Sequence, residues 1–130
     1  MSDDHYSKKI RFWGVTYVGT CGWFKQVKQN IRCIDAQTAA AERAQNKGLL
    51  IDVREPAEHL AKPAVGAINI PRGLLEMKLM ELEQDPNKAI YLHCATSARA
   101  ALSAEQLKRV GYKNVSVITC NMDDIQRSFS

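Results

Sequence analysis

Four short apolar runs recur along the chain and limit the folds that it can adopt. They cover residues 49–54, 67–71, 89–93 and 115–118, and prolines follow or close the first two. Runs of this length predict buried strands, because a strand that is covered on both faces needs no alternation with polar residues. Helical patterns fill most of the intervals between them. Strands that alternate with helices predict an α/β domain with a mostly parallel sheet and helices on both faces.

Three helices are predicted around these strands: one that begins after Asp35, one over residues 73–83 and one over residues 98–110. Asp35 can cap the first helix with its carboxylate, and Gly48 suits the position just past its end. A further short helix is expected near the C-terminus. The inward faces of the second and third helices are expected to carry Leu75, Leu79, Leu82, Ala100, Ala104 and Leu107.

The strand over residues 89–93 ends at a cysteine, and the loop after it has a composition suited to a reactive thiol. Four small residues, Ala95-Thr96-Ser97-Ala98, separate Cys94 from Arg99. Small residues let successive backbone N–H groups turn inward, while the next helix contributes its positive end and Arg99 a permanent cation. All three effects favour a thiolate, so Cys94 is predicted to be a nucleophile. The alternative is a buried structural cysteine at a strand end.

Three motifs, in order, resemble those of the single-domain rhodaneses, the thiosulfate sulfurtransferase family. They are Asp52-Val53-Arg54-Glu55, Gly66-Ala67-Ile68-Asn69-Ile70-Pro71, and Cys94 followed by four residues and Arg99. The resemblance implies a rhodanese-like fold over residues 34–130. It also implies that Cys94 takes sulfane sulfur from a small anionic donor such as thiosulfate, becomes a persulfide, and passes the sulfur to a thiophilic acceptor, cyanide or a thiol.

The same resemblance implies a role for each loop residue. The amides of Ala95, Thr96, Ser97 and Ala98 would cradle the substrate and the persulfide, and Arg99 would contact the anion. No cofactor and no metal is implied. Asp52 and Arg54 match the family's Asp-x-Arg pair, and we expect them to form a structural salt bridge.

Two other functions are weighed against this enzyme. Related phosphatases and arsenate reductases place five residues between cysteine and arginine, whereas this loop has four, so phosphatase activity is not expected. The second is a catalytically weak rhodanese-like binding module that docks a partner or a membrane surface through its N-terminal segment. It stays open because Ser97 stands where the family often has glycine, and Cys120-Asn121-Met122 replaces a common glycine pair.

Three further side chains near these motifs carry predictions. His93 points to the opposite face of its strand from Cys94, because side chains alternate along a strand, and it is expected to be packed or hydrogen-bonded. His59 is expected on a short surface helix. Cys120 is either a small buried residue or a thiol that resolves a Cys94 persulfide by forming a disulfide.

The first third of the chain differs in composition from the rest. Residues 1–33 hold six basic and two acidic residues and six of the nine aromatic residues, whereas residues 34–130 carry no net charge. This shift predicts a boundary near residue 33. Residues 12–32 are interpreted as a basic amphipathic segment that docks to a protein or membrane surface, or whose apolar side packs on the domain. Nucleic acid is not expected as a partner, because the domain itself is neutral.

The cysteines and the longest uncharged stretch indicate the cellular compartment of the protein. The four cysteines are Cys21, Cys33, Cys94 and Cys120, and no two form a C-x-x-C pair, so no metal site is expected. Reduced thiols in the cytoplasm are the simplest interpretation. The uncharged stretch over residues 12–24 is too short to span a bilayer as a helix, and it lacks a cleavage site for export.

Overall fold

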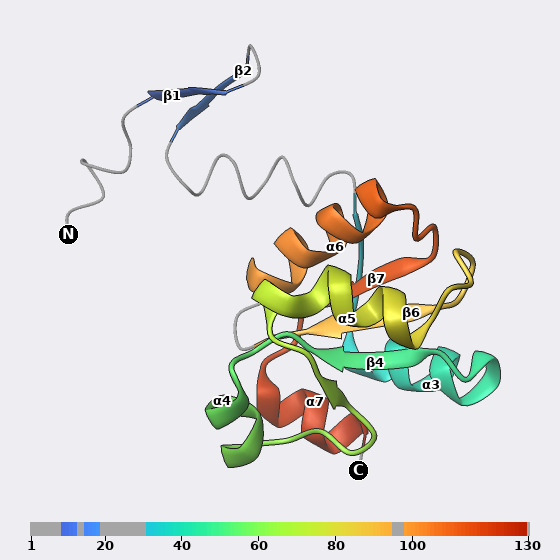
Figure 1. Ribbon diagram of the computed structural model, residues 1–130. Helices are drawn as coiled ribbons and strands as arrows, with labels where there is room; N and C mark the ends of the chain where they lie inside the picture. The colour runs from blue at the N-terminus through green and yellow to red at the C-terminus, as the bar shows by residue number, and fades with distance from the viewer. Residues whose placement is uncertain (1–8, 13–14, 19–30, 95–97, 130) are drawn as a thin grey trace.

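The computed structural model of the protein describes residues 9–12, 15–18, 31–94 and 98–129 (Figure 1). A five-stranded parallel sheet lies at its centre, with the strand order β3-β7-β6-β4-β5. Two further strands, outside this sheet, pair antiparallel with each other. The strands are β1 (Lys9–Phe12), β2 (Val15–Val18), β3 (Arg32–Ile34), β4 (Leu49–Asp52), β5 (Ile68–Asn69), β6 (Ile90–His93) and β7 (Val115–Ile118).

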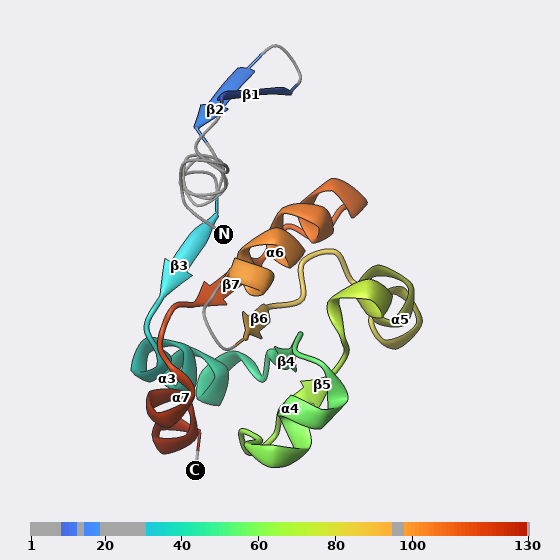
Figure 2. The ribbon, with the colours of Figure 1, turned by 90° about the vertical axis from the view of Figure 1, so that its left-hand side faces the viewer.

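Helices cover both faces of the sheet, as Figures 1 and 2 show together. Helices α5 and α6 lie on one face, and α3 and α7 lie on the other; α4 lies beside β4 and β5. This arrangement confirms the predicted α/β fold class. The bounds are α3 (Ala36–Asn46), α4 (Pro56–Ala61), α5 (Leu75–Leu82), α6 (Ala98–Val110) and α7 (Met122–Ser128), with a 3₁₀ turn, η1 (Arg72–Leu74), before α5.

The sheet separates two clusters of buried apolar side chains. Leu92 of the central strand β6, and Cys94 just past its end, pack with residues of α5 and α6, including Leu75, Leu79 and Leu107. On the other face, Leu50, Tyr91 and Ile118 pack with Ala39 of α3 and Ile125 of α7. The alternation along β6 therefore sends Cys94 toward α6 and leaves His93 on the opposite face, as predicted.

The first helix of the parallel-sheet domain, α3, begins and ends close to where its capping residues predict. Asp35 caps α3, because its Oδ1 accepts a hydrogen bond from the Thr38 N–H at 2.7 Å. The helix ends at Asn46, and Gly48 lies just past its end as expected, but the left-handed conformation falls on the C-cap Lys47, with φ 56°. Gly48 is needed for another reason: a Cβ there would lie 2.8 Å from the Ala89 carbonyl oxygen.

The inward face of α6 is confirmed and that of α5 only in part. Ala100, Ala104 and Leu107 are fully buried, and so are Leu75 and Leu79. The prediction for one leucine is wrong, because Leu82 is 58% exposed. Leu82 is the last residue of α5, and the backbone is already extended at the next residue, so the helix ends before its buried face can continue over the core.

The start of the sheet lies within the segment whose basic residues suggested a docking surface. Ile31 is buried in the core cluster that contains Cys94, and Arg32 opens β3. The Arg32 guanidinium donates to Glu42 of α3 at 2.8 Å and to the Ser116 hydroxyl at 3.0 Å. Residues 19–30, which hold most of the predicted amphipathic segment, lie outside the described residues. Within the described ranges, none of the helices is both long and apolar enough to cross a bilayer.

Candidate active site

Cys94 lies at the carboxyl end of the central strand β6, at the edge of the sheet where parallel α/β folds place their sites. Its side chain is fully buried against Val53, Leu92 and Ala100 of the same core cluster. The Cys94 Sγ accepts a hydrogen bond from the Ala100 N–H at 3.3 Å. That amide belongs to the first turn of α6, where N–H groups have no partner within the helix. It therefore stabilises negative charge on the sulfur.

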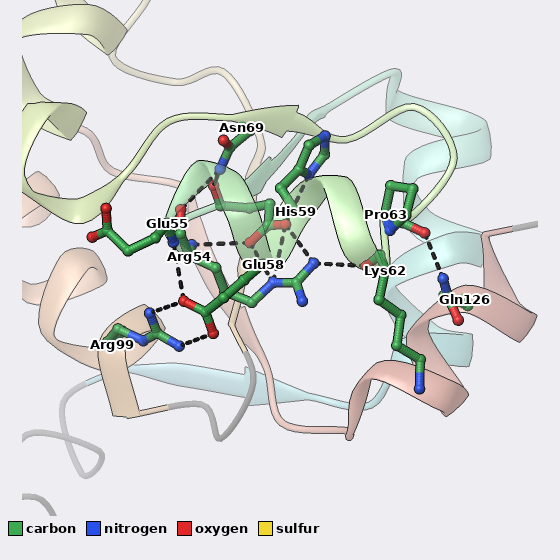
Figure 3. Close-up of polar contacts among 10 residues, drawn as sticks. Arg54, Glu55, Glu58, His59, Lys62, Pro63, Asn69, Arg99 and Gln126 are labelled. Carbon is green, nitrogen blue, oxygen red and sulfur yellow. Dashed lines mark hydrogen bonds and ion pairs between the residues drawn. The ribbon is translucent and has the colours of Figure 1, made fainter.

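Arg99 lies in the first turn of the same helix and brings a positive charge to the site. Its Nη1 and Nη2 donate to the two carboxylate oxygens of Glu58, at 2.7 and 2.9 Å (Figure 3). This two-point contact raises the pKa of Arg99, and negative charge at Cys94 raises it further. The guanidinium is therefore a fixed cation close enough to Cys94 to interact with it electrostatically.

Beneath α4 lies the predicted salt bridge of Asp52 and Arg54, and both side chains are almost completely buried. The Asp52 carboxylate accepts hydrogen bonds from the Arg54 backbone N–H at 3.0 Å, from Nε at 2.9 Å and from Nη2 at 2.7 Å. Burial raises the pKa of Asp52, but these hydrogen bonds offset it and hold that pKa below its usual value. Asp52 is therefore an ionised, fully bonded carboxylate in the interior.

This buried pair fixes the chain around α4. Arg54 Nη2 also donates to the Lys62 carbonyl at 2.7 Å, just past the end of the helix, and His59 Nδ1 lies 2.9 Å from Asp52. Asn69 of β5 donates to the carbonyls of Asp52 and Arg54 at 3.0 and 2.9 Å. His59 lies on a short helix, as predicted, but its ring is turned toward this network. The network thereby holds α4 where Glu58 meets Arg99 (Figure 3).

His93 is packed, as predicted, but without a hydrogen bond among the described residues. Its ring is fully buried, and neither ring nitrogen has a partner there. Burial lowers the pKa of His93 to about 4, and the positive charge of Arg54 lowers it as well, whereas Asp52 acts in the opposite direction. The ring is neutral at physiological pH. Because it faces away from Cys94, it is no general base for that thiol.

The structure thus brings together Cys94, Ala98 at the start of α6, and Arg99. Ala95, Thr96 and Ser97 lie outside the described residues, so the amide cradle predicted for them stays a prediction. Cys120 packs with the cluster on the other face of the sheet, and its Sγ accepts from the Ala36 N–H at 3.2 Å. Cys120 is partly exposed there. A resolving role toward Cys94 gains no support from this position.

The comparison with known families decides the classification. Residues 35–128 match the rhodanese-like domain family. The chain belongs to this family. The matched region contains strands β4 to β7 of the parallel sheet, together with Cys94, Arg99 and the Asp52–Arg54 pair, and β3 lies just before it.

Two curated relatives of this rhodanese-like domain come from Bacillus subtilis (strain 168). An uncharacterized protein, YqhL, is 40% identical over 65 residues, which are 50% of this chain and 50% of YqhL. A putative sulfur carrier protein, YrkF, is 32% identical over 75 residues, which are 58% of this chain and 40% of YrkF. The chain therefore spans half or less of the length of these two relatives.

Solved structures share the fold. The polysulfide-sulfur transferase homodimer of Wolinella succinogenes is 29% identical, with a TM-score of 0.63 over 78% of this chain and 77% of that one. A protein of unknown function and possible tyrosine phosphatase from Rhodopseudomonas palustris CGA009 has a TM-score of 0.71 over 85% of this chain and 90% of that one, at 21% identity. The second likeness shows the fold alone.

One residue of this rhodanese-like site was not found from the sequence. Glu58 was not predicted to reach the loop, although it holds Arg99 by both carboxylate oxygens. The available signal was the Glu55-Pro56-Ala57-Glu58 pattern, which is typical of a helix start and places a carboxylate one turn into α4. That pattern predicts a capping residue and carries no information about a partner on α6.

Proposed function

We propose that this rhodanese-like protein is a sulfurtransferase. It moves sulfane sulfur from a donor such as thiosulfate to a thiophilic acceptor, cyanide or a thiol, through a persulfide on Cys94. The observation that carries this proposal is the hydrogen bond from the Ala100 N–H to the Cys94 Sγ, beside the Arg99 guanidinium. The names of two relatives, a putative sulfur carrier and a polysulfide-sulfur transferase, support the same class of chemistry.

The first half-reaction begins with the Cys94 thiolate. The thiolate attacks the outer sulfur of thiosulfate, a Cys94 S–S bond forms, and the S–S bond of thiosulfate breaks. Sulfite leaves with the electron pair of that bond, and the negative charge stays on the terminal sulfur of the new persulfide. Arg99 and the N-terminal end of α6 favour this step, because they stabilise negative charge on donor and product.

The second half-reaction returns the enzyme to its starting state. Cyanide attacks the terminal sulfur of the persulfide, thiocyanate is released, and Cys94 recovers its electron pair as a thiolate. A thiol acceptor, as its thiolate, reacts in the same way and leaves as a persulfide. No net oxidation occurs in either half-reaction, so the thiol of Cys94 is the only group that the cycle requires to change its bonds.

Thiocyanate release tests this proposal. The full chain is incubated with thiosulfate and cyanide, and Cys94→Ser is compared with Cys120→Ser, which removes a partly exposed thiol from the other face of the sheet. We expect Cys94→Ser to fall to the uncatalysed rate and Cys120→Ser to keep the wild-type rate. Equal rates for wild type and Cys94→Ser, with thiosulfate and with polysulfide as donors, would overturn the proposal.

A further inference from the structure

The Arg99 guanidinium is engaged by a carboxylate of the protein itself. Its two terminal nitrogens both donate to Glu58, and the two side chains are 35% and 39% exposed. The ion pair therefore lies at the protein surface, at the N-terminal turn of α6. The Ala100 N–H of the same turn donates a hydrogen bond to the Cys94 sulfur. An anionic donor that approaches Cys94 meets a guanidinium whose charge is balanced by a carboxylate.

Glu58 is held in this position by contacts on its own helix and below it. Its Oε1 also accepts from the Glu55 backbone N–H at 3.2 Å, as part of the capping box that starts α4. The helix itself is anchored to Asp52 through His59. The hydrogen bonds from Arg99 lower the pKa of Glu58 to about 2, so this carboxylate stays ionised throughout the physiological range. Glu58 therefore balances the charge of Arg99 throughout this pH range.

We propose that Glu58 sets the charge preference of the Cys94 site. By neutralising Arg99, it favours sulfane sulfur donors with little negative charge, such as uncharged or singly charged persulfides and polysulfides, over dianions such as thiosulfate. This inference rests on the proposed function. Arg99 keeps N–H groups that Glu58 does not use, so a dianion can still bind. The bound dianion would then lie beside the Glu58 carboxylate, and the repulsion between the two negative charges weakens its binding.

The substitution Glu58→Gln separates charge from structure. Glutamine has the same shape and still accepts the Glu55 N–H, so the capping box is preserved. It also leaves an oxygen for Arg99 while removing the negative charge. Glu105→Gln is the matched control, because Glu105 lies on α6 with Arg99 but pairs with Arg109. Both variants lose one carboxylate, and thermal melting establishes that both are folded.

Two alkylating reagents, anionic iodoacetate and neutral iodoacetamide, measure how the charges around Cys94 affect an approaching anion. Peptide mass spectrometry reports the rate at Cys94 alone, so the other thiols do not interfere. At low ionic strength we expect the ratio of the iodoacetate rate to the iodoacetamide rate to rise about 3-fold to 10-fold in Glu58→Gln. The ratio should be unchanged in Glu105→Gln, and added salt should reduce the rise. In the enzyme assay, the KM for thiosulfate should fall by a similar factor with kcat unchanged.

Each outcome is decisive. An unchanged reagent ratio in Glu58→Gln, or an equal rise in Glu105→Gln, contradicts the charge preference while leaving the sulfurtransferase proposal intact. A capping role alone predicts this unchanged ratio, because glutamine preserves the cap. If Cys94 reacts with neither reagent in any variant, the nucleophile itself is in error. Both the proposed function and the inference built on it then fail.

Discussion

Two arginine–carboxylate pairs, Arg54 with Asp52 and Arg99 with Glu58, lie close to α4, and they differ in burial more than in geometry. Arg54 and Asp52 are almost fully buried, whereas the Arg99 and Glu58 side chains are 35% and 39% exposed. Each pair is joined by at least two hydrogen bonds of 2.7 to 3.1 Å. Their chemistry is the same, so the difference in their consequences comes from the surroundings.

We call Arg54 and Asp52 the inner pair, and Arg99 and Glu58 the outer pair. The side chains of the inner pair cannot exchange each other for water. Asp52 is fully bonded, and losing either member would leave an uncompensated charge inside the protein. The outer pair is accessible to solvent and to ligands, so its members can exchange partners at small cost. We therefore expect changes to the inner pair to alter stability and changes to the outer pair to alter which donors react at Cys94.

The largest effect is expected for Asp52→Asn. This change leaves the Arg54 guanidinium buried without a counter-charge, and it should lower the free energy of unfolding by about 3–5 kcal/mol. Urea denaturation followed by circular dichroism measures the loss. A loss below about 1 kcal/mol, equal to that of a surface pair, would show that the burial of the inner pair has no energetic consequence.

The inner pair also borders His93, which gives the stability a pH dependence. His93 has a pKa of 6.5 as a free side chain and about 4 in the folded protein, so the unfolded chain binds a proton more readily between these values. The free energy of unfolding should therefore fall by about 3 kcal/mol as the pH drops from about 6.5 to about 4. The lowered pKa values of Asp52 and Glu58 add losses that begin near the lower end of this window, as the pH falls toward their usual values of 3.8 and 4.5.

The substitution His93→Leu isolates this contribution. Leucine fills a similar volume without a titratable group, so the variant should lose most of the pH dependence in this window. Urea titrations of both proteins at several pH values measure it. If the two curves stay parallel between pH 6.5 and 4, His93 is not the group responsible.

On the outer pair, Arg99→Ala should affect activity more than stability. Removing the guanidinium should lower kcat/KM for thiosulfate about 10-fold to 30-fold, as expected for the loss of charge-assisted hydrogen bonds to an anion. The matched control is Arg109→Ala, which removes an exposed arginine from the far end of the same helix. Wild-type kinetics in Arg99→Ala, or an equal loss in Arg109→Ala, would exclude a specific anion contact.

The smallest effect is expected for the stability of Glu58→Gln. Because the outer pair is exposed, the free energy of unfolding should change by less than about 1 kcal/mol, and the change should shrink further at high salt. Thermal melting at two ionic strengths checks this expectation. A loss as large as that of Asp52→Asn would mean that the two pairs have equivalent structural roles.

Much of the fold follows from local patterns in the sequence. The predicted helix over residues 98–110 and the strand over residues 115–118 have the bounds that the structure gives them, because each is long or apolar enough to be determined locally. Strand β3 was missed, since it is three residues long and largely exposed. It exists because β7 offers it a partner, and a pairing over this sequence distance leaves no local pattern.

The candidate site divides in the same way. The position of Cys94 follows from the strand that ends there. The salt bridge of Asp52 and Arg54 follows from the Asp-x-Arg motif, whose two charged residues stand only two positions apart. The contact between Glu58 and Arg99 joins residues 41 positions apart, and it depends on how α4 is anchored. Neither helix carries a pattern that specifies the other, so only the folded chain reveals the pair.

The central claim is that Cys94 carries sulfur, and mass spectrometry of the protein after incubation with thiosulfate tests it most directly. Excess donor is removed, the intact mass is measured, and the modified peptide is sequenced. The account predicts a gain of one sulfur atom on the peptide that contains Cys94, which cyanide removes and which Cys94→Ser does not acquire. A protein that gains no sulfur from thiosulfate or polysulfide, or gains it on another cysteine while Cys94 stays unmodified, would contradict the account.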